Sequence, residues 1–208
     1  MTSLELFEAL APRLYPAIMG LGHYTERCCI FATRVAMDVG AYFGIDVWPQ
    51  TVQAVAYNQK FREHVEAEDF GLNDSWRSDG SHSVGIGHGL PGKPGVAVSR
   101  KTNQWNGHLI AVARGPLGCE AFGDFAINQA ERIDKDIRLG FAIFGPYSGQ
   151  EVWALVSPAA HGTVIEYRRT EGNDVYRTSP DWKKRSRREK IVGALIRDIR
   201  KEKHTCRG

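Results

Sequence analysis

The first twenty residues carry apolar side chains at the three- and four-residue spacing of a helix. These apolar positions are Leu4, Phe7, Leu10, Leu14 and Ile18. Pro12 and Pro16 fall inside the pattern, and proline in a helix interior bends or breaks it. The pattern therefore predicts two short helices or one kinked helix over residues 3–20.

A second apolar segment follows a short turn. It predicts a helix from about Glu26 to Phe43, with Thr25 as a plausible N-cap and Gly44 near its end. This segment contains two adjacent cysteines close to its start. It is therefore the first place in the chain where helix geometry and reactive chemistry coincide.

Beyond residue 44 the pattern changes to the alternation of strands. Ile45–Tyr57 is rich in valine and predicts a strand interrupted at Pro49. Further strands are predicted at 83–87, 108–113, 119–125, 141–144, 151–155 and 163–168. Loops with single helical turns are expected at 59–80 and 129–138, and a Gly/Pro loop at 89–95.

The last predicted element is a helix from about Asp181 to Lys203. Its apolar stripe consists of Ile191, Leu195, Ile196 and Ile199. The order of elements is thus helices first, then mostly antiparallel strands, then one more helix. That order indicates an α+β fold.

Composition adds that the chain is an ordinary globular protein. Its 208 residues are most simply one domain, with 42% apolar and 25% charged residues. The net charge of +3 argues against a chain that binds nucleic acid over its whole surface. Basic residues concentrate near the end, and 183–208 is predicted to be a basic C-terminal helix and tail. This segment is either a solvated helix face or a surface for an acidic partner or nucleic acid.

Four cysteines stand at positions 28, 29, 119 and 206. They are too few and too unevenly spaced for a disulfide framework, so we expect free thiols in a reducing compartment. No apolar run approaches the roughly 20 residues that span a bilayer, and no signal sequence is recognised. We therefore expect a cytoplasmic protein without a membrane partner.

Helix geometry distinguishes the two adjacent cysteines. At about 100° per residue, Cys29 shares a narrow stripe with three other small residues, whereas Cys28 lies on a more apolar stripe. The small residues that accompany Cys29 are Thr33, Ala36 and Gly40. A stripe of small side chains lets a helix lie close to a sheet, and the unpaired N–H groups of a helix start favour a thiolate. Cys29 is thus the predicted nucleophile, with Cys28 as the alternative.

A thiol nucleophile needs a base and a group that orients the base. If residues 115–117 form a three-residue hairpin loop, Arg114 faces Gly118 and His108 faces Asp124. A four-residue loop would instead put His108 and Asp124 on opposite faces. The predicted triad is therefore Cys29, His108 and Asp124, and His23 is a rival base.

The sequence also offers candidates for supporting groups. The backbone N–H of Cys29 is one natural donor to an oxyanion, and a second could come from Tyr24, Asn58 or Asn106. Trp105 and Gln129 are expected near the site. His82 and His88 lack a metal-ligand spacing, and no Gly-Lys-Ser/Thr follows the glycine-rich segments, so neither a metal nor a cofactor is expected.

Two spacings resemble the transglutaminase-like branch of the papain-like superfamily. The first places Gly44-Ile45 fifteen residues after Cys29, and the second places Asp124-x-x-x-x-Gln129 after the segment Gly107-His108-Leu109-Ile110. The resemblance covers about residues 25–130. Arylamine N-acetyltransferases and several uncharacterised bacterial and phage proteins have the same residue order. It implies a papain-like core with the cysteine helix packed on the sheet.

The resemblance also implies a mechanism. Cys29 would form a thioester, His108 would act first as base and then as acid, and Asp124 would orient His108. We therefore expect a cysteine-dependent acyl-transfer enzyme, namely an amide or peptide hydrolase, a deamidase or a transamidase. Its substrate would be a peptide, a protein or a small amide or ester. The alternative is a catalytically inactive papain-like protein that holds an acidic partner or nucleic acid with its basic helix.

Overall fold

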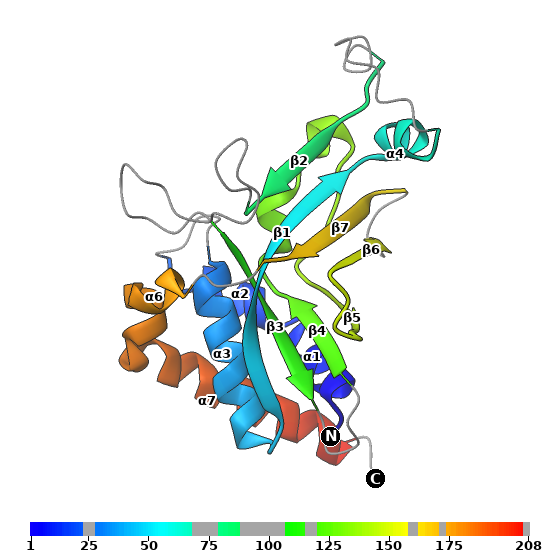
Figure 1. Ribbon diagram of the computed structural model, residues 1–208. Coiled ribbons are helices and arrows are strands. Elements are labelled where there is room, and N and C mark those ends of the chain that lie inside the picture. The colour runs from blue at the N-terminus through cyan, green and yellow to red at the C-terminus, as the bar shows by residue number, and fades with distance from the viewer. Residues whose placement is uncertain are drawn as a thin grey trace.

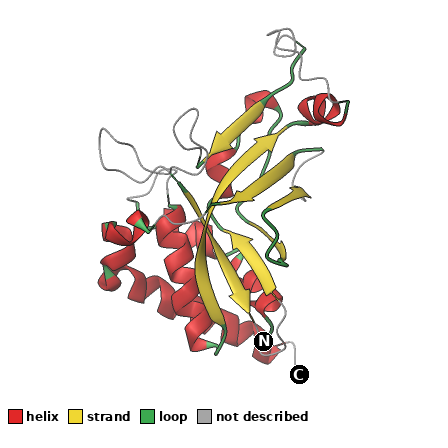
Figure 2. Cartoon of the chain, in the orientation of Figure 1, coloured by secondary structure: helices red, strands yellow, loops and turns green. Residues whose placement is uncertain are grey.

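The computed structural model describes residues 1–22, 28–67, 79–87, 107–114, 120–157, 162–170 and 174–205. The helices in these residues are α1 (Ser3–Leu10), α2 (Leu14–Met19), α3 (Cys29–Tyr42), α4 (Gln59–Glu66), α6 (Pro180–Lys183) and α7 (Arg185–Thr205). The strands are β1 (Asp46–Tyr57), β2 (Ser83–Ile86), β3 (His108–Arg114), β4 (Glu120–Asp124), β5 (Ile143–Pro146), β6 (Val152–Val156) and β7 (Val164–Arg169). Most helices lie together on one side of the strands (Figures 1 and 2). The expected α+β class is confirmed.

The N-terminal segment forms two short helices, as expected. A capping box starts α1, because the Thr2 hydroxyl accepts the Glu5 N–H at 3.1 Å and the Glu5 carboxylate accepts the Thr2 N–H at 2.9 Å. The apolar stripe of α1 differs from the expected one at one position. Leu4 is 43% exposed, whereas Leu6 is buried.

Helix α3 begins at Cys29, three residues later than expected. Cys28 is its N-cap residue and has a non-helical backbone, with φ −123° and ψ 10°. The expected N-cap, Thr25, and the rival base, His23, lie outside the described residues. At the other end, Gly44 adopts φ +72°, a left-handed conformation that favours glycine, and the chain turns there into β1.

The sheet is antiparallel and is organised around β1. Its strand order is β5-β4-β3-β1-β7-β6, and β2 also pairs with β1. The first half of β1 pairs with β3, and its second half pairs with β7 on one edge and β2 on the other. The expected interruption at Pro49 is wrong, because Pro49 pairs with Ala111 within a continuous strand. Pairing with β7 starts only at Val52, so within the described residues no strand pairs with Pro49 on that edge of β1.

Several helices and strands begin at other residues than the sequence predicts. The segment after β1 forms the two-turn helix α4 rather than a loop with one turn, and Asn58 caps it by accepting the Phe61 N–H at 3.0 Å. Strand β5 starts at Ile143, two residues later than predicted. The helical turn predicted at 129–138 is instead two 3₁₀ turns, Ile127–Ala130 and Ile133–Lys135. The expected Gly/Pro loop at 89–95 lies outside the described residues.

Aromatic contacts across the sheet demonstrate that it curls strongly. Phe122 on β4 lies 5.6 Å from Tyr167 on β7 and 5.7 Å from Trp153 on β6, measured between ring centroids. Strands β4 and β7 are three positions apart, which is about 14 Å in a flat sheet. These contacts therefore need the sheet to bend around its own apolar face. One buried cluster fills that concave face, and a second lies between the convex face and α1, α2, α3 and α7.

The stripe of small residues on α3 faces the sheet. The Thr33 hydroxyl donates to the Leu109 carbonyl oxygen of β3 at 3.1 Å. A Cβ atom on Gly40 would lie 2.4 Å from Cγ2 of Val47 and 3.1 Å from the Ile45 carbonyl oxygen. Helix and sheet are thus too close for any larger side chain at position 40. This close approach confirms the packing predicted from the stripe.

The C-terminal helical segment is broken at Lys184, and part of its basic run is internal. Arg188 is 4% exposed and pairs with Asp38 of α3, with 3.0 Å between Nε and Oδ2. Its Nη1 also donates to the carbonyl oxygens of Trp182 at 2.7 Å and Lys184 at 3.1 Å. Arg188 therefore fastens α6 and α7 to α3. Neither α7 nor any other helix in the described ranges is long and apolar enough to cross a bilayer.

The close approach at Gly40 gives a prediction with an internal control. Replacing glycine by alanine in a helix normally stabilises it by about 1 kcal/mol. At Gly40 the stiff Val47 side chain and a backbone oxygen oppose the new methyl group, which costs about 1–3 kcal/mol. We expect Gly40→Ala to lower the free energy of unfolding in urea titrations.

The matched control is Gly193→Ala in α7. Its Cβ atom would first meet the flexible end of Arg197, at 3.5 Å. We expect this variant to unfold at a higher urea concentration than the wild type. Two variants that both gain stability would contradict the tight packing of α3 on the sheet.

Candidate active site

His108 and Asp124 come from neighbouring strands, in a register that differs from the predicted one. Arg114 faces Glu120 rather than Gly118, so facing positions are shifted by two. The reason is a longer connection, which spans residues 115–119 and lies outside the described part. Because side chains alternate along a strand, a shift of two keeps His108 and Asp124 on one face, in diagonal rather than facing positions.

Asp124 is a fully buried carboxylate held by three donors. Its Oδ2 accepts from His108 Nε2 at 2.6 Å and from the Tyr167 hydroxyl at 3.0 Å. Its Oδ1 accepts the Ala126 N–H at 3.1 Å. A buried carboxylate needs such donors, and these fix both the carboxylate and the imidazole ring.

Tyr167 is the member of this group that sequence reasoning missed. It lies on β7, and only the curl of the sheet brings β7 over β4. Burial and the Asp124 carboxylate raise the pKa of the Tyr167 hydroxyl well above its usual value, so it stays a donor. The sequence predicted a strand at 163–168 but no partner for this hydroxyl.

Cys29 belongs to the core on the helix side of the sheet and influences the same imidazole. It is the first residue of α3, where backbone N–H groups have no partner within the helix. Its thiol contributes to the raised pKa of the His108 imidazole, and 8% of the residue is exposed. Because Nε2 of His108 faces Asp124, Nδ1 is the nitrogen that can exchange a proton with this thiol.

Cys28 has a different environment. It is 1% exposed, and burial, followed by the nearby charges of Cys29 and Asp124, raises the pKa of its thiol to about 12. A thiol with so high a pKa is protonated at neutral pH and is a poor nucleophile. Cys28 lies just before the helix on which the wheel argument placed both cysteines, and Cys29 stays the predicted nucleophile.

The charge balance at His108 favours its protonated form. Burial by itself lowers the pKa of the imidazole. The Asp124 carboxylate outweighs burial through its charge and hydrogen bond, and Cys29 adds to the effect. Together they raise the pKa of His108 from 6.5 to about 10. The protonated form of the imidazole is therefore favoured at neutral pH.

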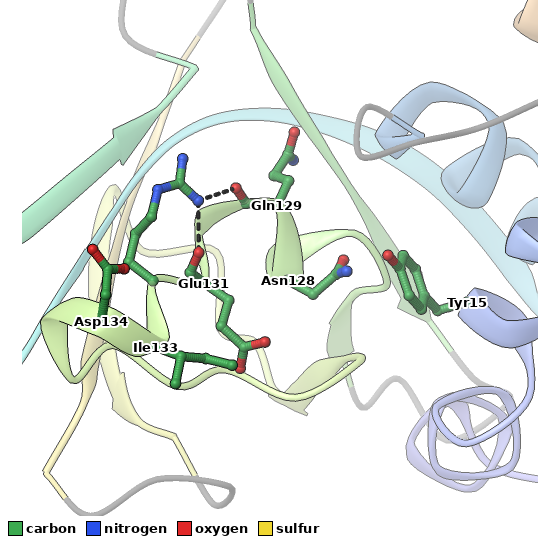
Figure 3. Close-up of a pocket in the computed structure, with 7 residues that line it drawn as sticks. Tyr15, Asn128, Gln129, Glu131, Ile133 and Asp134 are labelled. Carbon is green, nitrogen blue, oxygen red and sulfur yellow. Dashed lines mark hydrogen bonds between the residues drawn. The ribbon is translucent and has the colours of Figure 1, made fainter.

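A groove opens beside the triad. It has a volume of about 690 Å³ and is lined by Tyr15, Asn128, Gln129, Glu131, Arg132, Ile133 and Asp134. Gln129 belongs to both places, because its Nε2 also lies 2.9 Å from Nδ1 of His108. In Figure 3 the Gln129 amide points away from Ile133, and Tyr15 approaches from a separate element. Gln129 thus lies near the triad, as expected.

The other predicted supporting residues are placed differently. Asn58 lies six residues beyond Val52, the β1 residue that pairs with His108. Its amide is fully used elsewhere: Oδ1 accepts the Phe61 and His82 N–H groups, and Nδ2 donates to the Gly80 and Lys135 carbonyl oxygens. Asn58 is therefore a structural residue rather than an oxyanion donor. Tyr24, Trp105 and Asn106 lie outside the described residues.

Two tyrosines allow a test of the buried carboxylate. The Tyr147 hydroxyl is buried without a hydrogen-bond partner in the described structure, whereas the Tyr167 hydroxyl bonds to Asp124. We expect Tyr167→Phe to lower the free energy of unfolding by about 1–3 kcal/mol, because Asp124 loses a donor. Tyr147→Phe should be neutral or stabilising. Urea titrations of both variants measure this difference, and equal effects would contradict the role of Tyr167.

The raised pKa of His108 predicts how stability depends on pH. A group whose folded pKa exceeds its unfolded value stabilises fully below the unfolded value, here 6.5. That stabilisation is lost as pH rises toward about 10. We expect the free energy of unfolding to decline over this interval, and to decline less in His108→Gln. An unchanged slope in the variant would argue against a protonated His108.

Comparison of the chain with protein-family models, with curated proteins and with solved structures gives no match. The site must therefore be interpreted from its own residues. These residues are a thiol at the start of a helix, an imidazole whose pKa the thiol influences, and a buried carboxylate that is hydrogen-bonded to the imidazole.

Proposed function

We propose that this protein is a cysteine-dependent acyl-transfer enzyme in which Cys29, His108 and Asp124 are catalytic. The observation that carries the proposal is the placement of the two nitrogens of His108. Nε2 lies 2.6 Å from Asp124, so Nδ1, which also lies 2.9 Å from Gln129 Nε2, is the nitrogen that can exchange a proton with the Cys29 thiol. This is the arrangement in which a carboxylate orients an imidazole and the imidazole takes a proton from a nucleophile.

In the first half of the reaction, the Cys29 sulfur attacks the acyl carbon of an amide or ester. A C–S bond forms, and the carbonyl oxygen becomes an oxyanion that the Cys29 N–H at the start of α3 can stabilise. The C–N or C–O bond then breaks, and protonated His108 gives its proton to the leaving amine or alcohol.

In the second half, His108 accepts a proton from water or from an amine. The deprotonated oxygen or nitrogen attacks the thioester, the C–S bond breaks, and the Cys29 thiolate is restored. Water as acceptor gives a hydrolase or a deamidase, whereas an amine gives a transamidase. The substrate class within this proposal is a peptide, a protein or a small amide or ester.

The fold supports a papain-like or transglutaminase-like assignment within the same proposal. The nucleophile begins a helix packed on an antiparallel sheet, the base begins one strand, and the orienting carboxylate ends the next. Cys28 and Cys29 are both free thiols. A thiol nucleophile works where it stays reduced, so a cytoplasmic location fits the proposal.

The proposal predicts one fast-reacting thiol. At pH 6, iodoacetamide should alkylate Cys29 at least about tenfold faster than a free cysteine, because the neighbouring imidazole holds the proton. The rate is measured by intact mass and the position by peptide mapping. Cys29→Ala should abolish the fast reaction, and the matched variant Cys28→Ala should retain it.

The His108→Ala variant tests whether Cys29 reacts fast because His108 activates it or only because the thiol is accessible. We expect this variant to slow alkylation of Cys29 about tenfold or more, since the sulfur loses its base. Uniformly slow thiols in the wild type would instead support the alternative, an inactive scaffold whose basic C-terminal helix binds an acidic partner or nucleic acid. The internal ion pair of Arg188 lowers the number of basic side chains available for such binding.

A further inference from the structure

Gln129 lies between the groove and the base. It lines the groove, and its side-chain Nε2 lies 2.9 Å from His108 Nδ1. Its backbone is held, because Arg132 Nη1 donates to the Gln129 and Glu131 carbonyl oxygens at 3.1 and 2.6 Å (Figure 3). The amide group is therefore the part of Gln129 that determines what Nδ1 of the imidazole meets.

The surroundings of Asp124 place a positive charge on His108. The Asp124 carboxylate is fully buried, and a buried negative charge is costly unless a cation lies beside it. Of its three donors, the Tyr167 hydroxyl and the Ala126 N–H are neutral, which leaves His108 as the one that can carry the charge. The 2.6 Å between Nε2 and Oδ2 is as short as a charge-assisted hydrogen bond. The pKa of His108, which burial lowers and the Asp124 carboxylate raises to about 10, agrees with a protonated ring.

A protonated ring changes which end of the Gln129 amide can face it. The imidazolium form carries a hydrogen on both nitrogens, so Nδ1 is then a donor and needs an acceptor. The amide nitrogen is itself a donor, whereas the amide oxygen accepts. A half-turn about the last side-chain bond exchanges these two ends, and rotation about that bond is soft. The 2.9 Å contact therefore suits both forms of the ring: Oε1 can face the imidazolium, and Nε2 can face the neutral imidazole.

We propose that Gln129 is a positioning residue whose amide oxygen accepts the Nδ1–H of protonated His108. This hydrogen bond holds the proton on the ring until the leaving amine or alcohol takes it. The ring is then neutral, and the amide turns so that its N–H donates to the bare Nδ1. The inference rests on the proposed function and adds to it a residue that binds each form of the base in turn.

The test measures the titration of His108 directly. In the full-length chain carrying Cys29→Ala, the nitrogen NMR shifts of the isotope-labelled imidazole report the protonation of each ring nitrogen without a coupled thiol. Gln129→Met removes the amide and keeps most of the side-chain volume. A hydrogen bond to the charged ring is stronger than one to the neutral ring. We therefore expect the His108 midpoint to fall by about one pH unit, which is a tenfold loss of proton affinity.

Gln129→Glu is the conservative variant, because it keeps an acceptor oxygen beside Nδ1 and adds a negative charge. We expect its His108 midpoint to lie at or above that of the parent chain. The matched control is Gln59→Met. The Gln59 amide bonds to Glu63 on the exposed face of α4, so this variant should leave the His108 midpoint unchanged.

Three results would overturn the proposal. A higher midpoint in Gln129→Met would identify the amide nitrogen as the dominant partner of Nδ1, and an unchanged midpoint would mean that the contact does not distinguish the two forms. A lower midpoint in Gln129→Glu would also overturn it, even if the methionine variant fails to fold. The proposed function fails separately, when wild-type Cys29 reacts slowly with iodoacetamide and is indifferent to His108→Ala.

Discussion

A carboxylate with no contact with water determines the geometry of the site. Asp124 is 0% exposed, so each of its oxygens depends on protein donors. Those donors come from three directions: His108 from the adjacent strand, Tyr167 from across the curled sheet and the Ala126 N–H from the following turn. Because Tyr167 and His108 bond to the same carboxylate, the orientation of the imidazole ring depends on the curl of the sheet.

The site also lies where two apolar cores meet. His108 and Asp124 share a face with the cluster inside the curled sheet, whereas Cys29 belongs to the helix layer on the outside. They meet at the first residue of β3, because the close packing of α3 brings its N-terminus to that end of the strand. The reactive atoms are thus surrounded by protein on most sides, and charge on them is weakly screened.

The features that could be predicted from the sequence are those that depend on residues close together in the chain. The spacing of apolar residues predicted α3, and the small-residue stripe predicted its close contact with the sheet. The assumed three-residue hairpin loop put His108 and Asp124 on one face, and the two residues stay on one face because the register differs from the predicted one by two residues. The Asn58 cap could have been recognised, since asparagine before a helix is a common N-cap.

The missed features depend on long-range geometry. No pattern within β7 specifies that Tyr167 reaches Asp124, because that contact follows from the curl of the whole sheet. Pro49 suggested a break, and only the late start of the β1–β7 pairing explains why the strand continues. Gln129 was expected near the site, but its bond to Nδ1 depends on how the 3₁₀ turn after β4 is placed.

The buried position of Arg188 changes how sequence variation near the C-terminus should be judged. The guanidinium group bonds to the Asp38 carboxylate and to backbone carbonyl oxygens of α6 and the residue after it. Lysine conserves the charge but offers one nitrogen, which cannot reach acceptors in so many directions. An exchange that substitution tables treat as conservative would therefore loosen the attachment of the terminal helix to the helix that carries Cys29. Homologous chains that keep arginine here, while their other basic residues drift, would reveal this attachment in an alignment.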